Sequence, residues 1–362
     1  MQQVTDILIK ELSNSDVDWI KSTANRQEMN SGTVVVEKGK PVESFQIILD
    51  GTLGLYLSPE QEHKSSKFNQ ESEQELLKMT SGELLGEWYL IDPRPSVFTI
   101  KAIENSQVLS IPIQKIQAKI RQDIAFATHL YRALAMLIPH RMRWLNSQLD
   151  KEKLAVKSPQ SMKKVLFFLG ALNDSDIDWL LTNGSKKKIN TNQDLIKQGR
   201  PVDNLYILME GTMSISICTA KITCLSRTFA VDDSMSKPPE VARISSGEII
   251  GEMSFLDHEP ASATVSAVED SWVLSLPRCQ LTAKLQVDPG FASRFYLALG
   301  SVLEDRLRSN LMRFTKPNVD LSMSQMLSDE VEDINEINLD MLDDTAIAGA
   351  RFDWIMRRFR DI

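Results

Sequence analysis

The chain has 362 residues, of which 42% are hydrophobic and 25% are charged, and its formal net charge at pH 7 is −8. This composition is that of an ordinary globular protein, so it excludes wholesale disorder, collagen and a small disulfide-stapled scaffold. The acidic balance argues against nucleic-acid binding and against docking on an anionic membrane, because both need a basic surface.

The first residues contain no apolar core of a signal peptide, and no stretch reaches the roughly 20 apolar residues of a membrane span. We therefore expect a cytoplasmic protein. The cysteines Cys218, Cys224 and Cys279 and the four histidines show neither metal-ligand nor catalytic spacing. We expect no metal site and no enzyme activity.

Taken in chain order, the predicted elements occur twice. Four segments of the first half recur in the second half in the same order, two at an offset of 160 residues and two at 165. The pairs are 12–20 with 172–180, 38–52 with 198–212, 81–88 with 246–253, and 106–112 with 271–277. Such an internal repeat predicts a duplicated domain, with the two copies at residues 1–150 and 160–314.

Each copy is predicted to begin with a helix. Ser15 and Ser175 are candidate N-caps, and Asp18 or Asp178 follows three residues later, as in an acidic relative of the capping box. Short apolar runs rich in β-branched and aromatic residues follow, about 8–12 residues apart, which is typical of an all-β roll.

After the last strand each copy is predicted to be helical, because apolar residues recur every four positions. These residues are Phe126, Leu130, Leu134, Ile138 and Met142 in the first copy, and Phe291, Phe295, Leu299, Leu303, Leu307 and Leu311 in the second. Pro139 is expected to kink or end the first of these helices. Both stripes are interpreted as helix-on-roll packing, which is compatible with helix-to-helix association.

The end of the chain differs from both copies. Residues 316–345 contain nine acidic residues and one lysine, which predicts a disordered acidic linker at 315–345. Residues 346–362 form a basic amphipathic segment. It docks on a protein partner together with the acidic arm, folds back onto acidic surface of its own domains, or is a frayed tail. The candidate docking residues are Phe352, Trp354, Ile355, Arg357, Arg358 and Phe359.

Two further stretches are related, GEWYLIDPRPSVFTIKA at 86–102 and GEMSFLDHEPASATVSA at 251–267. Both resemble the phosphate-binding cassette of cyclic nucleotide-binding domains, as found in bacterial proteins, cyclic AMP receptors and kinase regulatory subunits. The resemblance covers both copies almost end to end. It implies an α+β fold of two tandem β-rolls, similar to jelly rolls, with flanking helices.

The resemblance also implies roles for individual residues. The glycine of each cassette allows close approach to a phosphate, and Glu87 and Glu252 take the ribose-binding position. The family's phosphate-binding arginine is replaced by Ser96 and Ala261, and Arg94 lies two residues before Ser96. The candidate ligand-binding residues are Gly86, Glu87, Arg94, Ser96, Thr99, Gly251, Glu252, Met253, Ala261, Ser262 and Thr264.

A charge-assisted hydrogen bond contributes about 1.5–3 kcal/mol, so loss of the arginine predicts binding weakened roughly 10- to 100-fold. We therefore expect a non-catalytic regulatory or adaptor protein that acts through protein contacts, with cyclic nucleotide binding weakened or lost. The alternative is a sensor of cyclic AMP or cyclic GMP whose C-terminal helices move on binding. A cyclic nucleotide is the one cofactor that the cassettes suggest, and a homodimer is left open.

Overall fold

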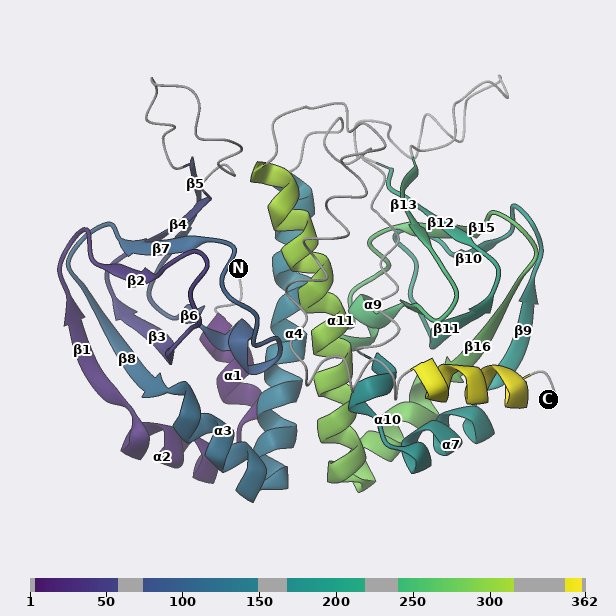
Figure 1. The fold of residues 1–362 in the computed structure, drawn as a ribbon, viewed down its shortest axis with the longest axis horizontal. Coiled ribbons are helices and arrows are strands. Elements are labelled where there is room, and N and C mark those ends of the chain that lie inside the picture. Colours follow the sequence, from purple (N-terminus) through teal and green to yellow (C-terminus); the bar gives the residue numbers. More distant parts are fainter. Residues whose placement is uncertain (1–3, 58–73, 149–167, 219–239, 316–348, 360–362) are drawn as a thin grey trace. The chain divides into compact units, whose positions relative to one another are not determined.

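The computed structural model describes residues 4–57, 74–148, 168–218, 240–315 and 349–359 (Figure 1). These residues belong to two compact units. Unit 1 contains residues 1–138 and 292–338, and unit 2 contains residues 139–291 and 339–362. The predicted domain ranges of 1–150 and 160–314 follow the sequence repeat, whereas these units follow packing.

Unit 1 begins with helices α1 (Val4–Glu11) and α2 (Asn14–Thr23), and its strands form two four-stranded antiparallel sheets. One sheet has the order β1-β8-β3-β6 and the other β2-β7-β4-β5. The strands are β1 (Asn25–Met29), β2 (Val34–Val36), β3 (Ser44–Asp50), β4 (Leu53–Leu57), β5 (Gln74–Met79), β6 (Leu84–Leu85), β7 (Thr99–Ala102) and β8 (Ser106–Pro112). A short 3-10 helix, η1 (Glu87–Leu90), lies between β6 and β7.

Unit 2 repeats this plan (Figure 1). Its sheets have the orders β14-β11-β16-β9 and β10-β15-β12-β13, which match unit 1 strand for strand. The strands are β9 (Ser185–Ile189), β10 (Asp194–Ile196), β11 (Asn204–Glu210), β12 (Met213–Ser216), β13 (Glu240–Ile244), β14 (Ile249–Ile250), β15 (Thr264–Ala267) and β16 (Ser271–Pro277). The predicted α+β class with two β-rolls is confirmed.

Helices follow and flank each roll. They are α3 (Ile113–Gln122) and α4 (Ile124–Gln148) after the first roll, and α7 (Asp174–Asn183), α9 (Glu252–Asp257), α10 (Arg278–Val287) and α11 (Pro289–Thr315) in the second half. Residues 168–171 and 349–359 are also helical. Helix α4 begins in unit 1 and ends in unit 2, and α11 does the reverse.

The apolar stripes predicted for the two long helices are buried. Phe126 and Leu134 of α4 are 1% exposed, and Phe295 and Leu303 of α11 are fully buried. Pro139 does not end α4, because the helix continues from Ile124 to Gln148 with the proline inside it. Within the described ranges, no helix combines the length and apolar character that a membrane crossing requires.

The observed N-caps lie two residues before the predicted ones. Ser13 caps α2: its hydroxyl accepts the N–H of Asp16, while a carboxylate oxygen of Asp16 accepts the N–H of Ser13 at 2.9 Å. Asn173 caps α7 in the same way with Asp176. The prediction of Ser15 and Ser175 was wrong because two capping spacings overlap in each copy, and the one that starts two residues earlier, at Ser13 or Asn173, is used. The spacing whose aspartate is buried forms the capping box.

The predicted acidic linker at 315–345 lies outside the described residues, apart from Thr315 at the end of α11.

Candidate functional site

Each cassette starts with a glycine in the left-handed region. Gly86 has φ +75° and Gly251 has φ +90°, and each directly precedes the short helix of its cassette. A Cβ atom at Gly86 would lie 2.4 Å from the carbonyl oxygen of Ser44, and one at Gly251 would lie 3.2 Å from that of Asn204. Both the backbone conformation and the close approach therefore require glycine at these positions.

The glutamate after each glycine is buried. Glu87 begins η1 and is 3% exposed, and Glu252 begins α9 and is 5% exposed. The two carboxylates that the family resemblance places at the ribose are thus held inside their units, next to the left-handed glycines.

The arginine near the first cassette is already paired. Arg94 donates from Nε to Asp92 at 2.8 Å and from Nη2 to Asp305 of α11 at 2.9 Å. All three side chains are nearly buried. Burial alone would lower the pKa of Arg94, but the hydrogen bonds and charges of Asp92 and Asp305 raise it above its ordinary value. The guanidinium of Arg94 is therefore shared between two carboxylates.

Residues at the end of the first cassette bind backbone. Ser96, at the position of the family's arginine, is 3% exposed and donates its hydroxyl to the carbonyl oxygen of Phe98 at 2.8 Å. The hydroxyl of Thr99 accepts the N–H of Lys38 at 3.3 Å. The Phe98 ring packs edge-on against Trp88 of η1, with ring centroids 4.9 Å apart. Aromatic side chains thus pack within this cassette.

The second cassette is apolar at the arginine position. Ala261 is 7% exposed and belongs to a buried hydrophobic cluster that includes Tyr206, Val265 and Ile250. Burial raises the pKa of the Tyr206 phenol. Such apolar surroundings strongly disfavour an unpaired phosphate charge, because they replace little of its hydration.

The remaining candidates in the second cassette contact one another or the neighbouring turn. The hydroxyl of Ser262 approaches the sulfur of Met253 at 3.8 Å, and the hydroxyl of Thr264 accepts the N–H of Gln198 at 3.1 Å. Thr264 repeats the contact that Thr99 makes in the first copy. The predicted residues of each cassette are therefore brought together, but mainly through structural contacts.

Arginines that the sequence reading did not single out hold the second cassette. Arg143 of α4 donates to Asp257, the last residue of α9, at 2.7 Å, and that carboxylate is fully buried. Arg278 at the start of α10 donates to the carbonyl oxygens of Ser254 and Phe255, and burial lowers its pKa. These contacts fix the C-terminal end of the short helix.

A partial signal for these partners exists in the sequence. Asp92 and Asp257 are equivalent at the offset of 165 residues, and so are Arg143 and Arg308. Arg308 donates to the carbonyl oxygen of Pro95 at 2.7 Å, so both equivalent arginines contact a cassette loop. The repeat therefore marked the positions, although not their partners.

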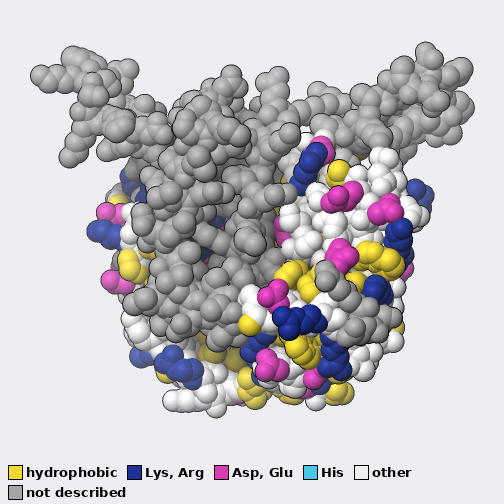
Figure 2. All heavy atoms as spheres, turned by 45° about the vertical axis from the view of Figure 1, so that its right-hand side comes forward, with side chains coloured by type: hydrophobic (Ala, Val, Ile, Leu, Met, Phe, Trp, Pro, Cys, Tyr) yellow, Lys and Arg dark blue, Asp and Glu magenta, His cyan; other side chains and the backbone are white. Residues whose placement is uncertain are grey.

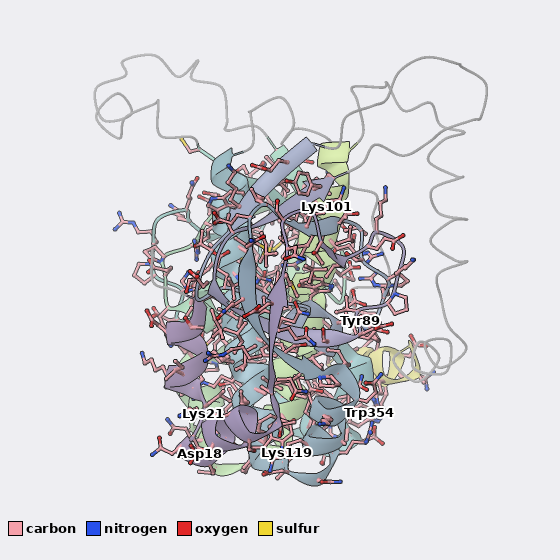
Figure 3. All side chains as sticks on the ribbon, turned by 90° about the vertical axis from the view of Figure 1, so that its left-hand side faces the viewer. Asp18, Lys21, Tyr89, Lys101, Lys119 and Trp354 are labelled. Atoms are coloured by element: carbon pink, nitrogen blue, oxygen red, sulfur yellow. The ribbon has the colours of Figure 1, made fainter. Side chains whose placement is uncertain are left out.

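The terminal segment folds against unit 2. Ile355 and Phe359 are 6% and 1% exposed, and Phe352 lines the same apolar groove. Arg358 pairs with Asp178 at 2.6 Å. Trp354, labelled in Figure 3, is 40% exposed, and Arg357 is also exposed. The candidate docking residues therefore divide between a face that packs within the chain and a face that remains open.

No group of three or more metal-ligating side chains occurs in the part of the chain that the structure describes.

Comparison with known families gives one assignment: the model of the family described as the cyclic nucleotide-binding domain matches residues 26–123 and 186–288, together more than half of the chain.

Solved structures similar to this chain include regulatory proteins. The regulatory domain of Toxoplasma gondii protein kinase A with cyclic AMP is 15% identical, with 76% of this chain and 87% of that chain covered and a TM-score of 0.28. The regulatory subunit of a cyclic AMP-independent protein kinase A from Trypanosoma cruzi, bound to guanosine, is 20% identical, with 78% and 80% covered and a TM-score of 0.27. The catabolite activator protein of Thermus thermophilus is 19% identical, with 51% and 75% covered and a TM-score of 0.33.

Among curated proteins, a patatin-like phospholipase domain-containing protein of Caenorhabditis elegans is 21% identical over 268 residues. The match covers 72% of this chain but only 16% of that protein's length. Two family matches, one in each repeat and each containing a cassette with its left-handed glycine, lead to one conclusion. The chain belongs to the cyclic nucleotide-binding domain family.

Proposed function

We propose that this chain is a non-catalytic, cytoplasmic regulatory or adaptor protein that acts through protein–protein contacts. In this proposal, ordinary cyclic nucleotide binding is weakened or lost in both rolls, and the cassettes instead anchor helices.

The observation that carries the proposal is the pairing of Arg94 with Asp92 and Asp305. A cyclic phosphate that used this guanidinium would have to displace one carboxylate and then lie beside the other. Both aspartates are about nine-tenths buried, so their charges are only weakly screened. The cluster that results is suited to holding α11 against the cassette loop.

The second cassette supports the same reading. Ala261 packs in an apolar cluster, and Arg278 and Arg143 bind the backbone and the buried carboxylate of the cassette helix. These arginines stabilise the cassette rather than present charge to a ligand.

Thermal unfolding of the intact protein tests the proposal. A ligand at 100 times its dissociation constant adds about 2.7 kcal/mol, which for units of this size shifts Tm by roughly 5–11 °C. We expect no such shift with millimolar cyclic AMP, GMP, CMP or UMP, or with cyclic dinucleotides. A shift that Glu87→Ala or Glu252→Ala abolishes would overturn the proposal.

One observation favours the alternative of a cyclic nucleotide sensor. Gln46 of β3 pairs with Leu85, the residue before Gly86, and is 6% exposed. Its Nε2 donates to the hydroxyl of Ser44, but its Oε1 has no hydrogen-bond partner among the described residues. The equivalent residue in the second copy is Tyr206. If one roll retains a ligand, the first offers this buried acceptor, and Gln46→Leu would reduce the thermal shift.

The partner contact is proposed for the terminal segment, through the acidic arm and the open face that carries Trp354 and Arg357. Tryptophan and arginine are the residue types most often found at the energetic centre of interfaces. A homodimer is one form that such a contact can take.

A further inference from the structure

The helix at residues 349–359 lies in an apolar groove of unit 2, which Phe352 and Ile355 of the helix help to line. Phe352, Ile355 and Phe359 are spaced i, i+3 and i+7, so they share one face of the helix. The groove that faces them is built from residues of the helix at 168–171, α7, β11 and β16. Its lining residues are Leu169, Ile177, Leu180, Leu181, Ile207, Met209 and Leu274.

Charged contacts fix both ends of this helix. Arg351 donates to the carbonyl oxygen of Leu169 at 2.9 Å and to Asp174 at 3.0 Å. Near the other end, Arg358 donates to Asp178 at 2.6 Å. Figure 2 shows hydrophobic, basic and acidic side chains beside one another on this side of unit 2. The contacts set the position and direction of the helix as well as its affinity.

A lysine of the groove completes the contact. Lys186 of β9 donates to the carbonyl oxygen of Phe359 at 3.0 Å and therefore satisfies an acceptor at the C-terminal end of the helix. Its ammonium group lies 4.7 Å from the Phe359 ring centroid and 5.0 Å from that of Trp272. The groove thus recognises a helix end and an aromatic side chain together.

The first copy serves as an internal comparison, because it has the same roll and keeps apolar residues at most of the equivalent positions but differs at three residues of this contact. Asp174, Leu181 and Trp272 correspond to Asn14, Lys21 and Gln107. Lys21 lies 3.9 Å from Asp18, the residue equivalent to Asp178, and both are labelled in Figure 3. In the first copy an exposed lysine therefore stands where the second copy has the buried Leu181, and it already pairs with the equivalent aspartate. These three differences distinguish the groove of the second copy.

We propose that this groove is a receptor site for a basic amphipathic helix, that residues 349–359 occupy it as a tethered internal ligand, and that a partner protein's helix of the same pattern exchanges with them. The pattern begins with an arginine and an apolar residue directly after it, as in Arg351 and Phe352. Two more apolar residues follow three and seven positions after the first apolar one, and a second arginine directly precedes the last of them. The choice of a protein helix as the exchanging ligand rests on the proposed protein–protein role.

Exchange is compatible with the size of the contact. The segment is a single short helix, and the Arg358 and Asp178 side chains are each about half exposed, so their pairing is weak and sensitive to salt. Residues 316–348 join the helix to α11 in the same chain, so binding of the helix to the groove is intramolecular. A modest intrinsic affinity therefore keeps the groove filled until a partner competes.

The test uses full-length protein and a fluorescent peptide of residues 346–362, without nucleotide. We call the full-length variant Ile355→Asp/Phe359→Asp the freed variant, because its two aspartates release the internal helix while the lining residues of unit 2 are unchanged. We expect anisotropy titrations to show saturable binding to this variant and at least tenfold weaker binding to the wild type. Leu181→Lys in the freed variant abolishes binding, whereas Ile9→Lys on the exposed α1 position of the first copy leaves it unchanged.

A charge exchange keeps the test independent of folding defects. Asp178→Arg in the freed variant weakens binding of the natural peptide, and a peptide with Arg358→Asp recovers it. The milder variant Arg351→Ala/Arg358→Ala keeps Phe352, Ile355 and Phe359. It also binds the natural peptide more tightly than the wild type does.

Equal binding to wild-type and freed chains would overturn the proposal, and so would a failure of the charge exchange. Peptide binding to phosphatidylserine vesicles but not to the freed chain would assign the segment to a membrane surface instead. A nucleotide-dependent thermal shift would reject the proposed loss of nucleotide binding without affecting the groove.

Discussion

At the scale of single residues, the proposed function depends most on the guanidinium of Arg94. It is held between Asp92, from its own cassette loop, and Asp305, which lies 211 residues away in the chain. A buried charge without a partner destabilises the folded state much more than a paired one. Removing different members of the cluster therefore lowers the free energy of unfolding by different amounts. The shared arginine matters more than either aspartate.

We predict that Arg94→Ala reduces the free energy of unfolding by about 3–5 kcal/mol, because it leaves two buried carboxylates together. Asp305→Ala leaves Arg94 paired with Asp92, and its expected cost is smaller, about 1–3 kcal/mol. Urea unfolding followed by circular dichroism measures both values. The exposed pair of Arg243 with Glu240 supplies the control, since Arg243→Ala should change little. An equal loss for Arg94→Ala and Asp305→Ala would contradict this assignment.

At the scale of elements, helix α2 is tied to α4 through its cap. Asp16 accepts the N–H of Ser13 and lies 2.8 Å from Nδ1 of His129 on α4. Burial alone would raise the pKa of Asp16, but the hydrogen bonds from Ser13 and the contact with His129 lower it below its ordinary value of 3.8. The cap therefore contributes stability only while this carboxylate is ionised.

The sign of the resulting pH dependence follows from the lowered pKa. Stability from Asp16 is fully present above its unfolded value of 3.8 and is lost as the pH falls through the lower folded value. We predict that the difference in unfolding free energy between wild type and Asp16→Asn is constant near neutral pH and shrinks below about pH 4. Denaturant titrations from pH 2.5 to 7 measure it. Asp18→Asn, on the exposed side of α2, should show no comparable trend.

At the scale of the whole molecule, each unit is built from both halves of the chain. Residues 292–315 of α11 belong to unit 1, where Phe295, Leu299, Val302 and Leu303 are at most 1% exposed. Burying four such side chains contributes about 6–12 kcal/mol, similar to the whole stability of a typical domain at about 5–15 kcal/mol. The first roll is therefore not expected to be stable without the end of the second repeat.

Dividing the chain tests this dependence. A fragment of residues 1–157 produced alone should aggregate or lack cooperative unfolding. Co-expression with residues 158–362 should yield a complex that co-purifies through a tag on one fragment and melts cooperatively. A cooperative melt of the 1–157 fragment alone, at the temperature of the intact chain, would show that residues 292–315 are dispensable to unit 1.

Much of the fold could be predicted because the two copies preserve local patterns. Short runs rich in β-branched and aromatic residues, about 8–12 residues apart, indicated both rolls, and the four-residue stripes indicated α4 and α11. Ser15 was misplaced as a cap because local spacing does not reveal which aspartate is buried. The sequence did not reveal that α4 continues past Pro139, because packing along a long helix compensates for the missing hydrogen bond.

The candidate site was less predictable than the fold. The two cassettes, with Gly86 and Gly251, were evident from the repeat, and their left-handed φ values agree with that reading. The contact of Arg94 with Asp305 could not be found, because no local pattern links residues so far apart in the chain. Long-range ion pairs depend on how complete elements pack, which a motif does not encode.

The division of α11 between units has a consequence for synthesis on the ribosome. Translation delivers residues 1–138 first, but unit 1 also needs residues 292–315, which emerge more than 150 positions later. At about 5–20 residues per second, the nascent first roll waits roughly 8–30 seconds with apolar helix surface uncovered. Unit 2 in turn also contains residues 349–359, which are made after residue 315. Each unit is thus completed long after its first residues are made, and we expect chaperones to bind the nascent first half.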